Sequence, residues 1–229
     1  MRVPRIVGAA LIFTVVSAAS SAAQNQLVNP GFESGDLSGW TVSTTGNSTV
    51  QVGMAGMPVP GSDPGYFGSG SSLVRSGAYS AFGAVSGFNL PQGTMLFSQV
   101  LSLTPGTTYD IGFFAANSAA MLTAYGVAIG PVNNGVLLFA DGVQLLPNVY
   151  NLVNAVTGQW FPIQASFTAT GATTTVEFSV TGSGSAYAPI SVDDFFVTAQ
   201  TVTPEPSTVV LLATGLLMVF AGGRRYRRA

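Results

Sequence analysis

The 229-residue chain contains no cysteine and no histidine, and because all seven of its basic residues are arginines it contains no lysine either. These absences exclude disulfide bonds, zinc sites of the usual His and Cys kind, a Ser-His-Asp triad and a Cys-His pair. Only carboxylates remain for acid and base chemistry. Charged residues make up 7% of the chain and apolar residues 47%, which is far from a disordered composition.

Positive charge is almost absent from the middle of the chain. Only Arg75 lies between residues 24 and 203, so this body is acidic although the whole chain has a formal net charge of −2. A nucleic-acid-binding surface needs clustered Lys and Arg, and no such cluster is present, so that class of function is excluded. The acidic residues of the body are Glu33, Asp36, Asp63, Asp110, Asp141, Glu177, Asp193 and Asp194.

The first 23 residues have the three regions of a secretory signal. Arg2 and Arg5 form a positive n-region, residues 7–16 an apolar h-region, and residues 21–23 a small-residue cleavage site. We therefore predict a signal peptide over residues 1–23, cleaved after Ala23. An uncleaved anchor is the alternative, but the apolar stretch is shorter than the roughly 20 residues that span a bilayer.

The other end of the chain has a second apolar segment. Residues 207–223 carry no charge and fall within the roughly 17 to 25 residues of a transmembrane helix. The positive-inside tendency would keep the arginines that follow in the cytoplasm and the preceding domain outside. A buried core helix is the alternative, although such a helix seldom ends in a run of arginines. These arginines are Arg224, Arg225, Arg227 and Arg228.

Between the two ends the sequence predicts strands and no helix. β-branched and aromatic runs, several of them alternating, are separated by Gly, Pro, Asn and Asp turns. Asp141-Gly142 predicts a hairpin with a type I′ turn over residues 136–146, and residues 53–72 predict a surface loop. We predict one all-β domain over residues 24–200, a jelly-roll β-sandwich, with a barrel as the alternative. The expected strands are 96–103, 108–116, 123–129, 135–140, 142–146, 161–169, 173–180 and 190–198.

Five blocks of the body are similar to those of the carbohydrate-binding-module-like, galactose-binding-like jelly rolls. The opening Asn-x-Gly-Phe-Glu with Gly-Trp shortly after, and the closing Asp-Asp, are the specific parts. The blocks are NPGFESGDLSGW (29–40), VRSGAYSAFGAV (74–85), SQVLSLTPGTTYDIGFFAAN (98–117), ATGATTTVEFSV (169–180) and ISVDDFFVT (190–198).

This resemblance implies one structural Ca²⁺ ion held by the opening Glu33 and by Asp193 or Asp194. Carboxylate and main-chain oxygens suit Ca²⁺, which takes six to eight such ligands. Strict alternation places Asp194 on the same face as Ile190 and Val192, where an unpaired carboxylate would be costly. The alternatives are a bulge that turns both aspartates to water, or main-chain N–H groups that satisfy them.

The tail resembles the PEP-CTERM sorting signal, a family of C-terminal signals on proteins exported by Gram-negative bacteria that make exopolysaccharide. The resemblance implies that an exosortase in the inner membrane recognises Pro204, Glu205 and Pro206. It also implies that the protein is anchored by its C-terminal helix before processing and then reaches the cell surface or extracellular matrix. Flanking prolines favour an extended backbone that would present Glu205 outside the membrane. An ordinary linker before an ordinary anchor is the alternative.

Three functions fit these observations. The first is a non-catalytic surface or matrix protein that associates with exopolysaccharide or other surface glycans, and the second is a dedicated carbohydrate-binding module. The third and least favoured is a glycoside hydrolase, which needs two carboxylates and no histidine. Sugar binding requires exposed aromatic rings, for which Trp160, Tyr125 and Tyr150 are the candidates, while Trp40 is expected to be packed and Glu177 to face solvent.

Overall fold

The computed structural model describes residues 23–46, 48–59, 71–85, 93–118, 121–124, 127–131, 134–152, 156–182, 188–200 and positions 212, 215 and 216. Residues 23–200 form one compact unit. The predicted signal peptide lies outside the described residues except for Ala23. The predicted transmembrane helix and the arginine run also lie outside them, apart from the helical positions 212, 215 and 216. Within the described part of the chain, no helix is long and apolar enough to cross a membrane.

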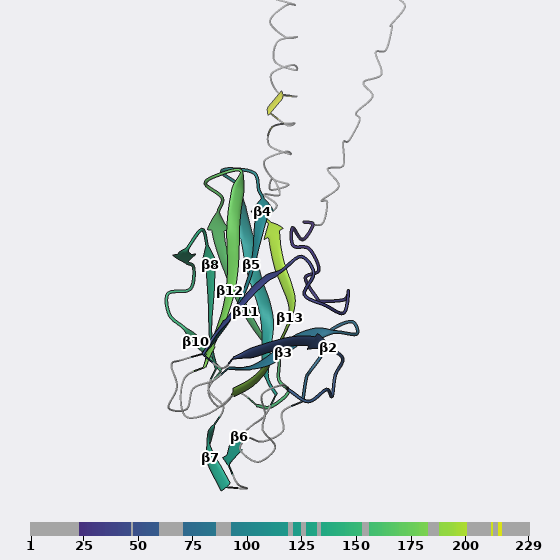
Figure 1. Cartoon of the computed structure of the whole chain (residues 1–229). Coiled ribbons are helices and arrows are strands. Elements are labelled where there is room, and N and C mark those ends of the chain that lie inside the picture. Colours follow the sequence, from purple (N-terminus) through teal and green to yellow (C-terminus); the bar gives the residue numbers. More distant parts are fainter. Residues whose placement is uncertain are drawn as a thin grey trace, which may run out of the picture. The chain divides into compact units, whose positions relative to one another are not determined.

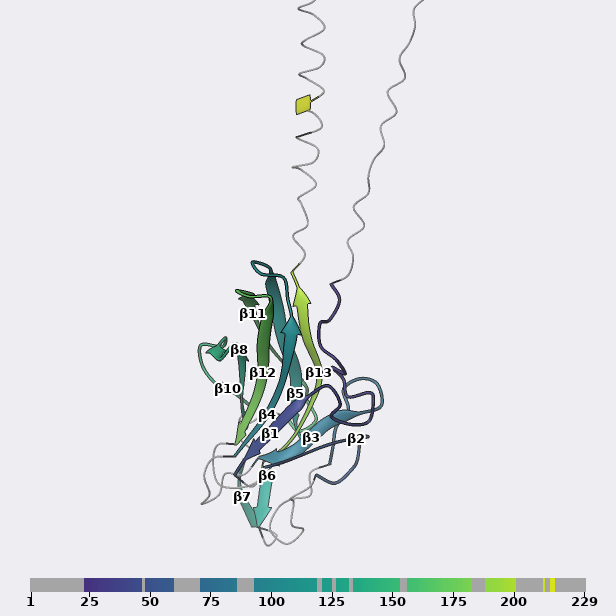
Figure 2. The same cartoon turned by 45° about the horizontal axis from the view of Figure 1, so that its top comes forward.

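Two antiparallel sheets make up the compact unit (Figures 1 and 2). The first has the strand order β1-β4-β12-β8-β10, with the short β9 also paired to β8. Its long strands β4 and β12 pair over nine residues. The bounds are β1 (Thr41–Thr45), β4 (Thr94–Ser102), β8 (Asn134–Ala140), β9 (Val143–Gln144), β10 (Tyr150–Asn151) and β12 (Thr173–Gly182).

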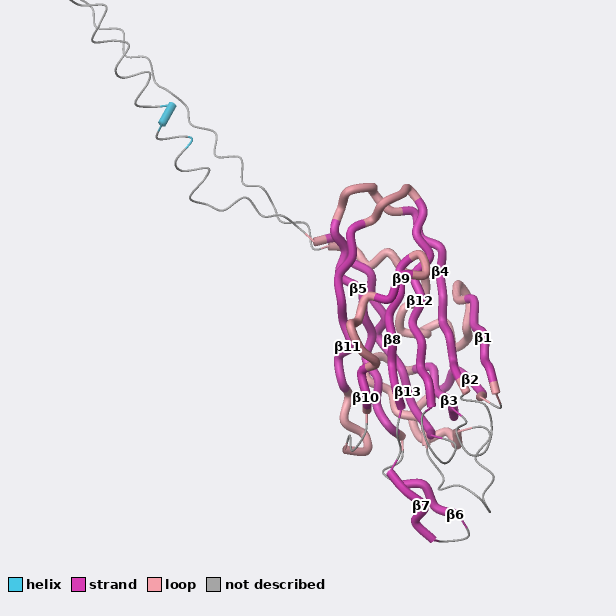
Figure 3. The backbone as a smooth tube through the Cα atoms, turned by 90° about the vertical axis from the view of Figure 1, so that its left-hand side faces the viewer, coloured by secondary structure: helices cyan, strands magenta, loops and turns pink. Residues whose placement is uncertain are grey.

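The second sheet has the strand order β11-β5-β13-β3-β2. A separate hairpin of β6 (Met121–Ala124) and β7 (Val127–Pro131) lies at one end in Figure 1. Figure 3 shows strands and loops throughout the described part of residues 23–200, with no helix among them. The bounds of the second sheet are β2 (Thr49–Gly53), β3 (Ser80–Val85), β5 (Thr108–Asn117), β11 (Phe161–Thr168) and β13 (Ala188–Ala199).

The core between the sheets is built on aromatic rings. Phe195 lies at its centre, with ring centroids 4.8 to 5.6 Å from those of five other aromatic side chains. Edge-to-face and offset pairs of this kind add to the stability gained by burying the rings. The five partners come from both sheets and from the segment before β1, and are Phe32, Trp40, Phe97, Phe113 and Phe178.

The fold confirms the all-β sandwich and most of the predicted strands. Asp141 and Gly142 both have positive φ, 49° and 74°, as a type I′ turn requires, and they join the paired strands β8 and β9. The single strand predicted over 123–129 is wrong, since β6 and β7 form a hairpin there. Strands β1, β2, β3 and β10 were not among the predicted strands, because they are short or lie in Gly- and Ser-rich sequence.

Alternation along β5 decides which side chains the second sheet presents outward. Tyr109, Ile111 and Phe113 are buried in the core, so Asp110, Gly112 and Phe114 point to the outer face. The segment before β3 is held against this outer face by side chains of β13. Its anchors include the main-chain N–H of Leu73, which donates to Ser191 Oγ at 2.9 Å.

Candidate functional site

The opening Asn-Pro-Gly-Phe-Glu motif forms a tight, hydrogen-bonded turn before β1. Asn29 and Phe32 have positive φ, 51° and 58°, which is uncommon for residues other than glycine. The Asn29 side chain donates to the main-chain carbonyls of Asp36 and Ser38, and the main-chain carbonyl of Asn29 accepts the indole N–H of Trp40 at 3.0 Å. The motif therefore places Phe32 and Trp40 in the core, which confirms that Trp40 is packed.

A β-bulge interrupts β13 at the closing Asp-Asp pair. The register with β5 shifts between Asp193 and Phe196, and Asp194 has a positive φ of 50°. The extra residue turns Phe195 into the core, in the place that strict alternation would give to Asp194. The expectation that Asp194 shares a face with Ile190 and Val192 is therefore wrong, and a bulge is the arrangement observed.

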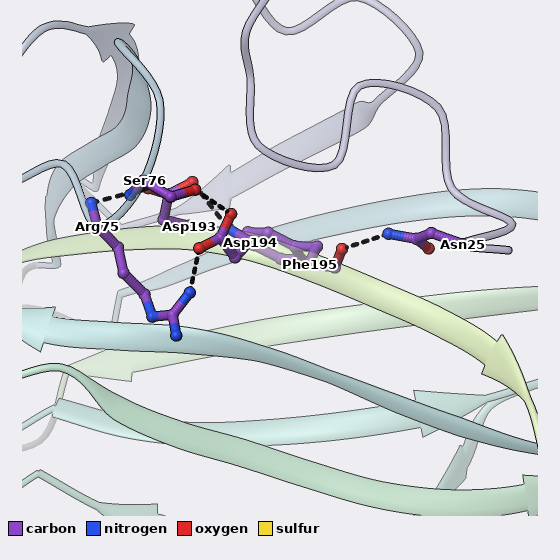
Figure 4. Close-up of polar contacts among 6 residues, drawn as sticks. All are labelled: Asn25, Arg75, Ser76, Asp193, Asp194 and Phe195. Carbon is purple, nitrogen blue, oxygen red and sulfur yellow. Dashed lines mark hydrogen bonds and ion pairs between the residues drawn. The ribbon is translucent and has the colours of Figure 1, made fainter. Parts of the chain in front are cut away.

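Asp193 is the buried member of the pair. Its Oδ2 accepts the main-chain N–H of Arg75 at 2.9 Å and of Ser76 at 3.3 Å, and its Oδ1 accepts the N–H of Asp194 at 2.7 Å (Figure 4). Burial raises the pKa of Asp193 from 3.8 to about 6. The three N–H donors lower this pKa, while the nearby Asp194 charge raises it further. The carboxylate thus ties the segment before β3 to β13.

Arg75 is the positive group of this cluster. Its Nη1 makes an ion pair and hydrogen bond with Asp194 Oδ2, while Asp194 Oδ1 accepts the Ser76 hydroxyl at 2.7 Å (Figure 4). The guanidinium carbon also lies 3.4 Å from the centroid of the Phe114 ring on the outer face of β5. A cation over an aromatic face is attracted by the ring quadrupole. The body's single arginine therefore joins the segment before β3 to β13 and β5. We call the group of Arg75, Ser76, Phe114, Asp193 and Asp194 the clasp.

Glu33 approaches the same cluster from the opening turn. Its carboxylate accepts the main-chain N–H of Ala78 at 3.0 Å and of Tyr79 at 3.3 Å. A Cβ added at Gly31 would lie 3.7 Å from atoms of Glu33, Asp193 and Asp194 alike. The structure thus brings together the three residues that the sequence pointed to.

The oxygens of these three carboxylates accept hydrogen bonds within the protein. Their donors are main-chain N–H groups, the Ser76 hydroxyl and the Arg75 guanidinium. Among the described residues, no group of three or more acidic, Cys or His side chains is arranged to hold a metal ion. The calcium ion stays a prediction of the sequence alone. From the sequence alone, Arg75 is assigned no role in this site. The fact that it is the only basic residue among so many acidic ones could have indicated that it pairs with a carboxylate.

The predicted sugar-stacking residues do not lie on one element. Tyr150 is exposed on β10, at the edge of the first sheet, and Trp160 is half-buried just before β11 of the second sheet. Tyr125 lies outside the described residues. Glu177 is half-buried on the outer face of β12, paired with Ser98 and Phe139, which agrees with an outward-facing residue.

Comparison with known proteins identifies the tail and the fold. Residues 202–228 match the model of the PEP-CTERM protein-sorting motif. TmCBM61, whose structure is a complex with beta-1,4-galactotriose, has a TM-score of 0.52 at 19% identity, covering 78% of this chain and 100% of that chain. The CBM22-1 xylan-binding domain of Paenibacillus barcinonensis Xyn10C has a TM-score of 0.47 at 14% identity, covering 81% and 100%. Comparison with curated proteins gives no match.

The body therefore has the fold of carbohydrate-binding-module jelly rolls, as its sequence blocks predicted. The chain also carries a PEP-CTERM sorting motif, which indicates an exported protein sorted to the cell surface. Residues Pro204, Glu205 and Pro206 and the four terminal arginines fall within the matched segment.

Proposed function

We propose that this protein is a non-catalytic surface protein of a Gram-negative bacterium, sorted by an exosortase, whose jelly roll associates with exopolysaccharide. The observation that carries the proposal is a PEP-CTERM motif at residues 202–228 that directly follows a jelly-roll domain ending at β13. The motif indicates where the protein is sorted, and the fold is the one that carbohydrate-binding modules use to bind glycans.

In this proposal, different parts of the tail have different roles in sorting. Pro204 and Pro206 fix φ on either side of Glu205 and favour an extended backbone that an exosortase can bind. The apolar segment 207–223 holds this stretch at the inner membrane, and the terminal arginines keep the end of the chain in the cytoplasm. Processing then releases the jelly roll or transfers it to the surface.

The carboxylates of the jelly roll favour binding over catalysis. Glycosidases place two carboxyl groups on either side of the scissile bond, roughly 5 to 9.5 Å apart. Asp193, Asp194 and Glu33 are occupied by N–H, hydroxyl and guanidinium donors. Asp110 and Glu177 lie on the outer faces of different sheets. If a glycoside hydrolase activity were measured and survived both Glu33→Gln and Glu177→Gln, neither glutamate would be its acid or base.

A dedicated carbohydrate-binding module is the second candidate, favoured by the fold shared with TmCBM61. Such a module would bind a defined glycan with micromolar or better affinity in a glycan array. The half-buried Trp160 is its first candidate platform. An array without a ligand, together with an unchanged polysaccharide pull-down of Trp160→Ala, would contradict this candidate.

The sorting proposal is tested by expressing the full chain and a chain lacking residues 204–229 in strains with and without exosortase. We expect the full chain to be shortened and to leave the inner membrane only in the strain with exosortase. The truncated chain should show no such difference between strains. Mass spectrometry and cell fractionation report both properties. A full chain that stays unprocessed and membrane-bound in both strains would contradict the proposal.

A further inference from the structure

The outer face of the second sheet contains a hollow of about 370 Å³. This volume lies within the range of roughly 300 to 1,000 Å³ that is typical of small-molecule sites. The hollow spans β11, β5 and β13, and is distinct from the clasp around Asp193. It is lined by Asp110, Gln164, Ala165, Ser166, Phe196 and Thr198.

Strand register explains why these side chains meet. Gly112 of β5 is paired with Gln164 of β11 and with Phe196 of β13. Two residues further along, Asp110 is paired with Ser166 and Thr198 in the same way. Residues directly opposite in an antiparallel pair share one face of the sheet. Two parallel rows of three residues therefore form the hollow, with no side chain at the centre of the first row.

The missing side chain at Gly112 positions the Phe196 ring. A Cβ at Gly112 would overlap the Ile163 carbonyl oxygen and would lie 2.6 Å from Phe196 Cζ. The ring of Phe196 thus leans across β5 and rests on the glycine backbone, yet the residue is only half-buried. Phe196 faces outward because of the bulge at Asp194. The hollow is therefore provided with an aromatic ring that is held on one side and accessible on the other.

The remaining lining is polar and carries no positive charge. Asp110 Oδ1 accepts a hydrogen bond from Gln200 Nε2 at 2.7 Å, which orients the carboxylate. Gln164 and Ser166 are exposed, and their side chains make no hydrogen bond with any other described residue. A carboxylate, a primary amide and two hydroxyls can bind several hydroxyl groups, whereas an acidic ligand would be repelled by Asp110.

We infer that this hollow is a binding site for a neutral sugar unit of a polysaccharide. The apolar face of the sugar packs on the Phe196 ring, and its hydroxyl groups bind Asp110 and Gln164. An apolar platform with a few fixed polar groups is what such a ligand requires. The inference rests on the proposed association with exopolysaccharide and names the surface that provides it.

The test uses the full-length chain purified in detergent and electrophoresed through native gels that contain exopolysaccharide from the producing strain. We expect the polysaccharide to retard the unsubstituted chain and Phe196→Ala to weaken binding by about tenfold, as truncation of a central binding residue does. Gln164→Ala should weaken it less and, being an exposed substitution, should leave the fold intact. The matched control is Phe139→Ala, an aromatic residue on the outer face of β8 in the other sheet.

The outcomes separate the site from the function. Retardation that is unchanged in both Phe196→Ala and Gln164→Ala, with unaltered melting curves, would overturn the site while leaving glycan association in place. A full-length chain that the polysaccharide does not retard would overturn both the site and the glycan association, although exosortase processing would still stand on its own experiment. Selective weakening in the two hollow variants, with Phe139→Ala unaffected, supports the site.

Discussion

Asp193 makes a specific contribution to the pH dependence of stability. Its pKa is raised by burial from 3.8 to about 6, so the native state binds this proton more tightly than the unfolded chain. The stabilisation from this group is complete below about pH 3.8, is lost as the pH rises through about 6, and does not change above that. The full effect is about 3 kcal/mol at most. Asp194 is the charged group that acts on it, while Arg75 contacts it through the main-chain N–H.

We predict that Asp193→Asn removes this loss of stability between pH 4 and pH 6. Urea unfolding at intervals from pH 4 to pH 8 measures the slope of the free energy of unfolding against pH. Any cost of placing the asparagine amide among N–H donors is the same at every pH, so it does not change this slope. Glu177→Gln, on the other sheet, is the control. The lowered pKa of Asp36, about 2 because of hydrogen bonds with Ser34 and Ser38, acts only in more acidic solution. An unchanged slope in Asp193→Asn would contradict the prediction.

Arg75 should stabilise the domain through two partly exposed contacts. Its ion pair with Asp194 is about a third exposed on the arginine side, which limits its value to about 1 kcal/mol or less. Stacking on Phe114 adds about 0.5 to 1 kcal/mol. We predict that Arg75→Met lowers the free energy of unfolding by about 1 to 2 kcal/mol. A double-mutant cycle with Asp194→Asn isolates the ion pair, and zero coupling would show that the ion pair itself contributes nothing to stability.

The same cluster allows a direct test of the calcium prediction. If Arg75 and the main-chain N–H groups are enough to stabilise these carboxylates, removal of calcium with EGTA should leave the thermal midpoint unchanged in the unsubstituted chain. A lower midpoint in EGTA, restored by added Ca²⁺, would instead support the ion that the sequence blocks imply. Magnesium added in place of calcium is the control for a general effect of divalent ions.

At the scale of elements, the pairing of β2 with β3 depends on one glycine. A Cβ at Gly83 would overlap the main-chain carbonyl oxygen of Thr49, so the two strands could not keep their spacing. We predict that Gly83→Ala destabilises the domain by about 1 to 3 kcal/mol, as overpacking does. Gly171→Ala is the matched control, since its Cβ would meet only ordinary contacts. Urea unfolding gives both values, and equal stability of the two variants would contradict the prediction.

The elements also show how far sequence patterns reach. Asp141-Gly142 predicts its hairpin because two positive φ angles in a row demand such residues. The bulge at Asp194 carries no comparable signal, since its cause is the gain from placing Phe195 among five aromatic rings distant in sequence. The gathering of Glu33, Asp193 and Asp194 followed from resemblance alone. The hollow around Phe196 could not be predicted, because it depends on both the bulge and the register across three strands.

For the whole molecule, the residues of the hydrophobic core and the residues of the sorting motif lie in separate parts of the sequence. Every large side chain that is fully buried in the described residues lies between Phe32 and Phe195, and the sorting motif begins at residue 202. Residues 23–200 form a compact unit by their own contacts. We therefore predict that a chain ending at Gln200 melts at the same temperature as the full-length chain in the same detergent. Circular dichroism at a β-sheet wavelength measures both midpoints. A chain ending at Tyr109, which lacks most of both sheets, is the unfolded control, and a midpoint several degrees lower for the chain ending at Gln200 would show that the tail contributes to the fold.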